Sequence, residues 1–162
     1  MDADQYPLMR AQEEQHWWYR GNRAVVRRLL ARWRPSRCER WLDAGCGTGQ
    51  NLIAFADVGA AIGLDYSQAA LDLCRQRGLP NLVRGSIADL PFADASLDLV
   101  TCFEVLYHQA IADWRDGVAQ LARVVRPGGL VVLREPALEI LRGAHDAAVH
   151  GSHRFSRREL HQ

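Results

Sequence analysis

The chain has 162 residues, 48% of them hydrophobic and 24% charged, which is the balance of a single globular domain with a hydrophobic core. A formal net charge of +1 argues against a protein built mainly to grip nucleic acid or an acidic membrane. All 20 basic residues are arginine, so neither a lysine Schiff base nor a P-loop lysine is available.

Cysteine spacing and the N-terminal sequence indicate a cellular compartment. Cys38, Cys46, Cys74 and Cys102 are widely spaced and form no C-x-x-C motif, which favours reduced, mostly buried thiols over disulfides or zinc ligands. The N-terminus lacks the apolar core of a signal peptide, and no apolar run approaches the roughly 20 residues that cross a bilayer. We therefore predict a soluble, cytoplasmic chain that binds no membrane.

The first predicted element is a helix over residues 23–34. Asn22 is the predicted N-cap and Pro35 the stop. Its predicted buried face, which packs on a sheet, consists of Val25, Val26, Leu29, Leu30 and Trp33. The aromatic residues just before this helix have an alternative use as a lid over a binding site.

Strand and helix patterns then alternate along the chain. Strands are predicted at 40–44, 60–65, 81–85, the first part of 96–106, and within 127–136, where a Pro-Gly-Gly turn precedes the strand. Helices are predicted at 50–59, 67–78 and 113–125. This order predicts an α/β fold, a Rossmann-like doubly wound sheet of five parallel strands with flanking helices. Ser156 and Glu159 form a predicted capping box in a tail without strand signals.

The glycine loop LDAGCGTGQN, residues 42–51, lies between a predicted strand and a predicted helix. Such a loop presents free N–H groups and the positive end of a helix. Its G-x-G-x-G spacing differs from the G-x-G-x-x-G of dinucleotide folds, and Asp43 is unfavourable beside a pyrophosphate but favourable beside an ammonium group. Asp65, at the end of the next strand, suits two ribose hydroxyls, and it also suits the start of the following helix.

Four ordered motifs resemble the class I S-adenosylmethionine-dependent methyltransferases, in the group with small-molecule-type methyltransferase domains. They are WLDAGCGTGQN, AIGLDYS, GSIADLPFADASLDLVTCFEVLYH and LARVVRPGGLVVLREP. The opening HWWYRGNR and the tail HDAAVHGSHRFSRREL resemble a bacterial subgroup. The resemblance implies S-adenosylmethionine as cofactor, S-adenosylhomocysteine as product, and methyl transfer to a small-molecule O, N or C acceptor.

The resemblance also implies a set of cofactor contacts. Asp43 would lie near the methionine ammonium, Asp65 would hold the ribose hydroxyls, and Tyr66 would flank the adenine. Where the family often has Gly-Asp-Ala, this chain has Gly85-Ser86-Ile87, so Ser86 would meet adenine without charge. The full predicted set is Asp43, Gly45, Cys46, Gly47, Asn51, Asp65, Tyr66, Ser86, Ile87 and Phe103.

The acceptor side is predicted from the end of the fourth strand and from both ends of the chain. Glu104 and His108 are the catalytic candidates. The resemblance implies that Glu104 lines the floor beneath the sulfonium with Phe103. The unperturbed pKa of histidine suits proton transfer near neutrality, and the alternative is that His108 only shapes the pocket. The predicted substrate contacts are Trp18, Tyr19, Arg20, Tyr107, His145, His153 and Arg154. No metal is expected, because the histidine spacing fits no strong metal template.

The predicted organisation is an aromatic and Arg-rich helical cap at 1–35, a cofactor-binding core at 36–137, and a flap at 138–162. The family sheet has seven strands, so the resemblance predicts a chain that lacks the C-terminal two. The fifth strand would then have an open edge, covered by the rest of a longer protein, a homodimer mate or a partner chain. Two other functions stay open: a non-catalytic cofactor-binding or partner-binding module, and an NAD-dependent oxidoreductase. Nucleic acid is disfavoured as a partner.

Overall fold

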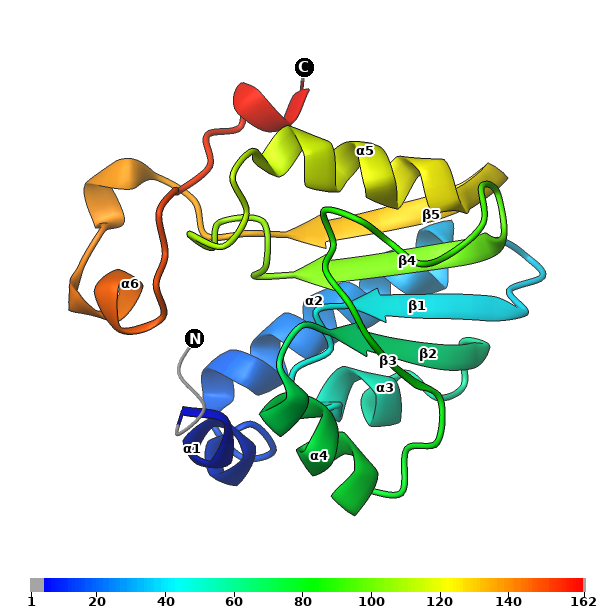
Figure 1. Ribbon diagram of the computed structural model, residues 1–162, viewed down its shortest axis with the longest axis horizontal. Coiled ribbons are helices and arrows are strands. Elements are labelled where there is room, and N and C mark those ends of the chain that lie inside the picture. Colours follow the sequence, from blue (N-terminus) through cyan, green and yellow to red (C-terminus); the bar gives the residue numbers. More distant parts are fainter. Residues whose placement is uncertain (1–4, 162) are drawn as a thin grey trace.

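The computed structural model describes residues 5–161, which form an α/β fold around one parallel sheet (Figure 1). In chain order the elements are α1 (Gln5–Gln12), α2 (Trp17–Trp33), β1 (Arg40–Ala44), α3 (Gln50–Ala54), β2 (Ala60–Asp65), α4 (Gln68–Gln76), β3 (Leu82–Arg84), β4 (Leu97–Phe103), α5 (Trp114–Val124), β5 (Val125–Arg134), α6 (Ala144–Ala148), and single 3-10 turns at Glu139–Leu141 and Glu159–His161. The predicted fold class is confirmed. None of the helices in the described part is long and apolar enough to cross a membrane.

The strand order is β3-β2-β1-β4-β5, and all neighbours are parallel. The order reverses between β1 and β4, and ligands of open α/β sheets bind at the carboxyl ends of the strands beside such a reversal. In Figure 1 the strand arrowheads point toward the side where α1 and the C-terminal tail lie. The fold therefore brings α1 and the tail segment around α6 to the edge of the sheet where a ligand is expected.

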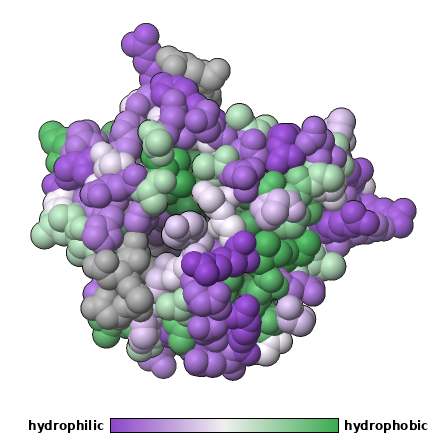
Figure 2. All heavy atoms as spheres, in the orientation of Figure 1, coloured by the Kyte–Doolittle hydropathy of each residue, from purple (hydrophilic) through white to green (hydrophobic). Residues whose placement is uncertain are grey.

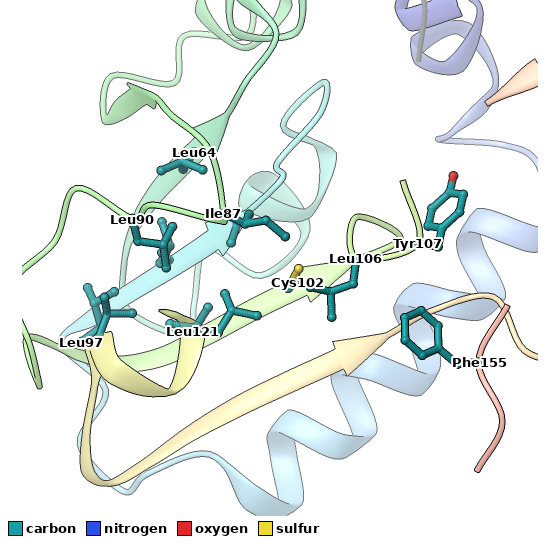
Figure 3. Close-up of a cluster of buried hydrophobic side chains, with 13 residues drawn as sticks. Leu64, Ile87, Leu90, Leu97, Cys102, Leu106, Tyr107, Leu121 and Phe155 are labelled. Carbon is teal, nitrogen blue, oxygen red and sulfur yellow. The ribbon is translucent and has the colours of Figure 1, made fainter. Parts of the chain in front are cut away.

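Each face of the sheet carries its own hydrophobic cluster. One cluster includes Leu121 and Val124 of α5 and Phe155 of the tail, and Figure 3 shows several of its members. The other cluster includes residues from α2, α3 and α4 packed around Trp41. The Trp41 indole Nε1 donates to Thr101 Oγ1 at 3.0 Å, so this fully buried ring also has its polar atom satisfied. On the face in Figure 2, hydrophilic residues alternate with smaller hydrophobic patches.

Helix α2 begins earlier than the sequence predicts. His16 is its N-cap, because the His16 Nδ1 accepts the Trp18 N–H at 3.3 Å. The prediction of Asn22 as N-cap is wrong, since Asn22 lies inside the helix; the histidine cap and packing outweigh the weak helix propensity of Gly21 and Asn22. The end before Pro35 is confirmed.

The buried face of α2 is narrower than predicted. Val26 and Leu30 are buried, whereas Val25, Leu29 and Trp33 keep 58%, 41% and 60% of their surface exposed. Successive positions of a helix are rotated by about 100°, so residues 25, 29 and 33 lie beside the line of contact with the sheet. The predicted helix at 50–59 is also shorter, because α3 ends at Ala54 and the chain turns to bury Phe55 and Val58.

Two smaller sequence predictions are confirmed. The four cysteines are free, and Cys46, Cys74 and Cys102 are buried. In the predicted capping box, the Ser156 N–H donates to Glu159 Oε2 at 2.7 Å and the Glu159 N–H donates to Ser156 Oγ at 3.3 Å. The single 3-10 turn at Glu159–His161 follows this capping box.

Candidate functional site: a cofactor and acceptor face

The glycine loop packs against the end of β2 through its backbone. The N–H groups of Gly45 and Cys46 both donate to the Leu64 carbonyl, at 2.7 and 2.9 Å. Gly45 has φ = 83°, and a Cβ there would stand 2.2 Å from the Val105 side chain. Glycine is therefore required at position 45 for both its conformation and its close contact.

Asp43 is the buried acid of this loop. Its Oδ1 accepts the Thr101 hydroxyl at 2.6 Å, whereas its Oδ2 is buried and has no hydrogen-bond partner among the described residues. Burial raises the pKa of Asp43 to about 6, opposed by the Thr101 hydrogen bond, the positive charge of Arg134 and the side chain of Asn51. A buried carboxylate oxygen without a partner is an incomplete site for a cation, which is the chemistry that an ammonium group supplies.

Asp65 joins the loop to the start of α4. Its Oδ2 accepts the Gly47 N–H at 2.8 Å and its Oδ1 accepts the Ser67 N–H at 2.8 Å. Burial raises the pKa of Asp65, and these backbone hydrogen bonds partly offset the shift. Ser67 is the N-cap of α4, so Asp65 orients the loop and the helix start together.

Helix α1 lies against the same loop, and the sequence predictions include none of its residues. Tyr6 is buried, and its pKa is raised to about 12 by burial and by the charge of Asp65. The Met9 methyl group stands 3.2 Å from the position of a Cβ on Gly47. Tyr6, Met9 and Glu13 are spaced three and four residues apart, so helical periodicity is the signal that would have found them.

Glu13 is the anchor of this N-terminal segment. Both of its carboxylate oxygens accept the Thr48 hydroxyl, at 2.7 and 2.6 Å, and Glu13 also pairs with Arg77 just beyond α4. The side chains of Glu13 and Arg77 are only 5% and 8% exposed. The Thr48 contact ties the segment that follows α1 to the glycine loop, and the buried pair ties it to the end of α4, so α1 lies at the wall of the candidate site.

On the predicted adenine side, the residues lie in different environments. Ile87 is buried, and Tyr66 has a side chain that is 73% exposed. The Ser86 hydroxyl accepts the Ala88 N–H at 3.2 Å. Ser86 and Ile87 follow β3, next to the end of β2, so the topology brings this turn to the Asp65 side of the site.

The opposite side of the site gathers residues from α2, β4 and β5. The Arg134 guanidinium lies 4.9 Å from the ring centre of Phe103 and 5.7 Å from that of Trp18. Arg134 Nη2 also lies 3.3 Å from Glu104 Oε1. Tyr19 packs edge-on to Trp18, and its pKa is raised by burial and by the charge of Glu104. Arg134, which was not predicted, thus connects three predicted residues by cation–π and charge contacts.

His108 lies beside the tail. Burial lowers the pKa of His108 to about 4, so the expectation of a pKa near neutrality does not hold for this imidazole. The His108 and His150 rings are 6.1 Å apart, and the Tyr107 carbonyl accepts the Ser152 N–H at 2.8 Å. Tyr107 is buried as well, so the tail packs over the loop that carries Tyr107 and His108.

The remaining predicted acceptor residues are not gathered in one place. Arg154 binds the buried Asp146 at 2.8 and 3.1 Å and the Ala137 carbonyl at 3.0 Å, which gives it a role in folding the tail. His153 lies 3.1 Å from Glu159, and Arg20 is exposed. The side chain of His145 lies outside the part of the chain that the structure describes.

Comparison with known proteins identifies the family. A family model described as a methyltransferase domain matches residues 42–133, so the chain belongs to the methyltransferase domain family. A probable S-adenosylmethionine-dependent methyltransferase from Mycolicibacterium smegmatis is 36% identical over 127 residues, covering 76% of this chain and 47% of the relative. A malonyl-[acyl-carrier protein] O-methyltransferase from Serratia marcescens is 35% identical over 127 residues, covering 77% and 49%. The chain spans about half the length of these relatives.

Solved structures agree with this family. An amino pentose methyltransferase from Micromonospora echinaspora, solved with S-adenosylmethionine bound, has 32% identity and a TM-score of 0.63, covering 79% of this chain and 55% of that one. A methyltransferase structure from Thermotoga maritima matches with a TM-score of 0.76 and 21% identity, covering 98% of this chain and 72% of the Thermotoga chain. This match concerns the fold alone. Together the matches support S-adenosylmethionine as the cofactor.

Proposed function

We propose that the chain is an S-adenosylmethionine-dependent methyltransferase that acts on an O, N or C atom of a small molecule. The observation that carries this proposal is Asp43, whose buried Oδ2 has no partner in the described residues although its Oδ1 is bound by Thr101. This acid lies at the glycine loop of a chain that belongs to the methyltransferase domain family. An ammonium group from the cofactor would complete its coordination.

The residues present fit the proposed cofactor. Asp43 would hold the ammonium group, the backbone of Gly45 and Gly47 would approach the amino acid and ribose, and Asp65 would accept the ribose hydroxyls. Tyr66, Ser86 and Ile87 stay proposed for the adenine. The bound cofactor supplies a methyl group on a positively charged sulfur, which is already activated for displacement.

The contribution of the protein is then alignment and exclusion of water. Phe103 offers an aromatic face at the end of β4, and Arg134 fixes this ring and Glu104 from the other side. His108 is neutral at pH 7 because its pKa is about 4, so it accepts a hydrogen bond from the acceptor more readily than it removes a proton. We propose Glu104 and His108 as the groups that face the acceptor.

Calorimetric titration of the purified chain tests the proposal. We expect S-adenosylmethionine and S-adenosylhomocysteine to bind with micromolar affinity and NAD not to bind. Binding of NAD instead would identify an oxidoreductase. Binding of both sulfur ligands without turnover of a panel of hydroxyl, amine and activated-carbon acceptors would favour a non-catalytic module, and a folded chain that binds none of the three would contradict the proposed function.

The affinity for S-adenosylhomocysteine is expected to fall at acid pH. The ammonium of the ligand requires an ionised Asp43, whose pKa without ligand is about 6, so the free protein binds an additional proton below that pH. Between pH 7 and pH 5 we expect Kd to rise about tenfold, which is the loss expected when one proton must leave on binding. Calorimetry at both pH values measures this change. Asp43→Asn is the control, because we expect it to bind more weakly and without this pH step. A flat profile in the unsubstituted chain would contradict the role of Asp43.

A homodimer or a partner chain along β5 also stays a proposal. Strand β5 pairs with β4 on one side and forms an edge of the sheet within residues 5–161. Unpaired edges are commonly covered in natural proteins. Light scattering of the purified chain tests the homodimer, and a monomeric mass at all concentrations would contradict it.

A further inference from the structure

The loop of Glu104–His108 carries both residues that the proposed function places before the acceptor. It follows β4 directly, and Glu104 has φ = 60°, a left-handed conformation that residues with a side chain rarely adopt. Such a conformation persists only where the surrounding structure fixes it. The loop therefore needs contacts that hold its backbone.

Glu135 supplies these contacts from the first position after β5. Its Oε1 accepts the N–H of Val105 at 3.1 Å and the N–H of Leu106 at 3.0 Å. Two successive amides of the loop thus converge on one side chain from the neighbouring strand, although the two segments are about 30 residues apart in sequence.

The surroundings of Glu135 oppose its charge. Its Oε2 is buried without a hydrogen-bond partner in the described part of the chain, and burial raises the pKa of Glu135 to about 7. The nearby groups are the buried thiol of Cys102, the phenol of Tyr107 and the carboxyl of Glu104. Burial of this carboxyl is unfavourable, and its hydrogen bonds are all to loop amides. We therefore infer that it stabilises the loop conformation more than it stabilises the core.

The side chains of the loop are fixed on the other side by packing. Figure 3 shows Leu106 and Tyr107 just beyond the end of β4, near Phe155 of the tail, and all three are buried. The Ser152 N–H and hydroxyl both donate to the Tyr107 carbonyl, at 2.8 and 3.0 Å. Between these anchors, Glu104 and His108 flank the segment whose amides Glu135 binds.

We propose that Glu135 is a positioning residue for the acceptor side of the site: by binding the amides of Val105 and Leu106 it holds Glu104 and His108 in their working orientation. The proposal rests on the proposed methyl transfer for its catalytic consequence. Its structural part, the fixing of the loop by one carboxyl, stands independently of any activity.

Three variants test the proposal. Glu135→Ala removes the acceptor of the loop amides, whereas Glu135→Gln keeps a side-chain carbonyl in reach of them. Asp72→Asn is the matched control, an acid-to-amide change at an exposed position of α4 whose carboxyl contacts Arg75. In Glu135→Ala we expect kcat to fall by about tenfold or more, because the reacting groups lose alignment. We expect Kd for S-adenosylhomocysteine to change less than about twofold, since Glu135 itself binds the amides of Val105 and Leu106, and the Asp43 and Asp65 carboxylates stay in place.

Hydrogen exchange provides the readout that does not need activity. The amides of Val105 and Leu106 are expected to exchange about tenfold faster in Glu135→Ala than in the unsubstituted chain, and to stay protected in Glu135→Gln and Asp72→Asn. Unchanged exchange at these amides in Glu135→Ala would overturn the proposal even if turnover fell. If Glu135→Ala does not fold, Glu135→Gln decides: retained kcat and protection support positioning through the carbonyl, and their loss contradicts it. Failure of the unsubstituted chain to bind S-adenosylhomocysteine would overturn the proposed function. The exchange result would still test whether Glu135 holds the loop.

Discussion

Replacement of Asp65 by alanine is expected to weaken binding of S-adenosylhomocysteine by at least about tenfold, and up to about a hundredfold, because hydrogen bonds to a charged acceptor are worth roughly 1.5–3 kcal/mol. Asp65 has two connected roles. Its two oxygens bind the N–H groups of Gly47 and Ser67, which shape the loop, and its carboxylate is the proposed partner of the ribose hydroxyls. The substitution therefore removes a ligand contact and the support of the loop together.

Calorimetric titration measures the change, with circular dichroism to establish that the variant is folded. Asp57→Ala is the matched control, because Asp57 is an exposed aspartate paired with Arg27 at 3.0 Å. Asp65→Asn separates the two roles, since it keeps one carbonyl oxygen for a backbone N–H without the negative charge. A folded Asp65→Ala chain with unchanged affinity would remove Asp65 from the cofactor site.

Replacement of Arg77 by alanine is expected to lower the free energy of unfolding by about 3–5 kcal/mol, the usual cost of leaving one member of a buried ion pair without its partner. Glu13 would stay buried with only the Thr48 hydroxyl and the Arg23 charge to stabilise it. The pKa of Glu13 is already raised by burial, so protonation of Glu13 removes the unpaired charge in the variant. The loss is therefore expected to be smaller at pH 5 than at pH 8, because a raised carboxyl pKa favours the native state where that carboxyl is protonated.

Urea unfolding at the two pH values measures both effects. Arg75→Ala is the control on the same helix, because the Arg75–Asp72 pair is 52% and 56% exposed, and we expect it to cost no more than about 1 kcal/mol. The double variant Glu13→Gln with Arg77→Ala should recover part of the lost stability, since no buried charge remains. A loss below about 1 kcal/mol in Arg77→Ala would mean that the pair contributes little to the stability of α1.

Much of the fold follows from local patterns in the sequence. The predicted strands at 40–44 and 60–65 match β1 and β2 at both ends, because short apolar runs bounded by glycine and acidic residues give clear signals. The predicted start of α2 was wrong, because Gly21 and Asn22 resemble a helix start locally, whereas His16 provides the actual N-cap. The predicted boundaries at 1–35, 36–137 and 138–162 stay predictions.

The candidate site divides in the same way. Asp43 and the glycines were predictable because a strand, a loop and a helix carry them within one short motif, and Asp65 was predictable because it ends the next strand. The pairs Glu13–Arg77 and Glu135–Val105 were not, since their members are 64 and 30 residues apart and no local pattern links them. Likewise, the low pKa of His108 depends on burial by a tail that the sequence does not locate.

The docking of α1 also sets an order of folding. An isolated helix of eight residues is marginal in water, so α1 needs its tertiary partners to persist. Those partners, Gly47, Thr48, Asp65 and Arg77, all come later in the chain. On a growing polypeptide, α1 is synthesised before these partners, so we expect it to become stable only after β1, β2 and α4 have assembled and to behave as a late and separable unit of the native structure.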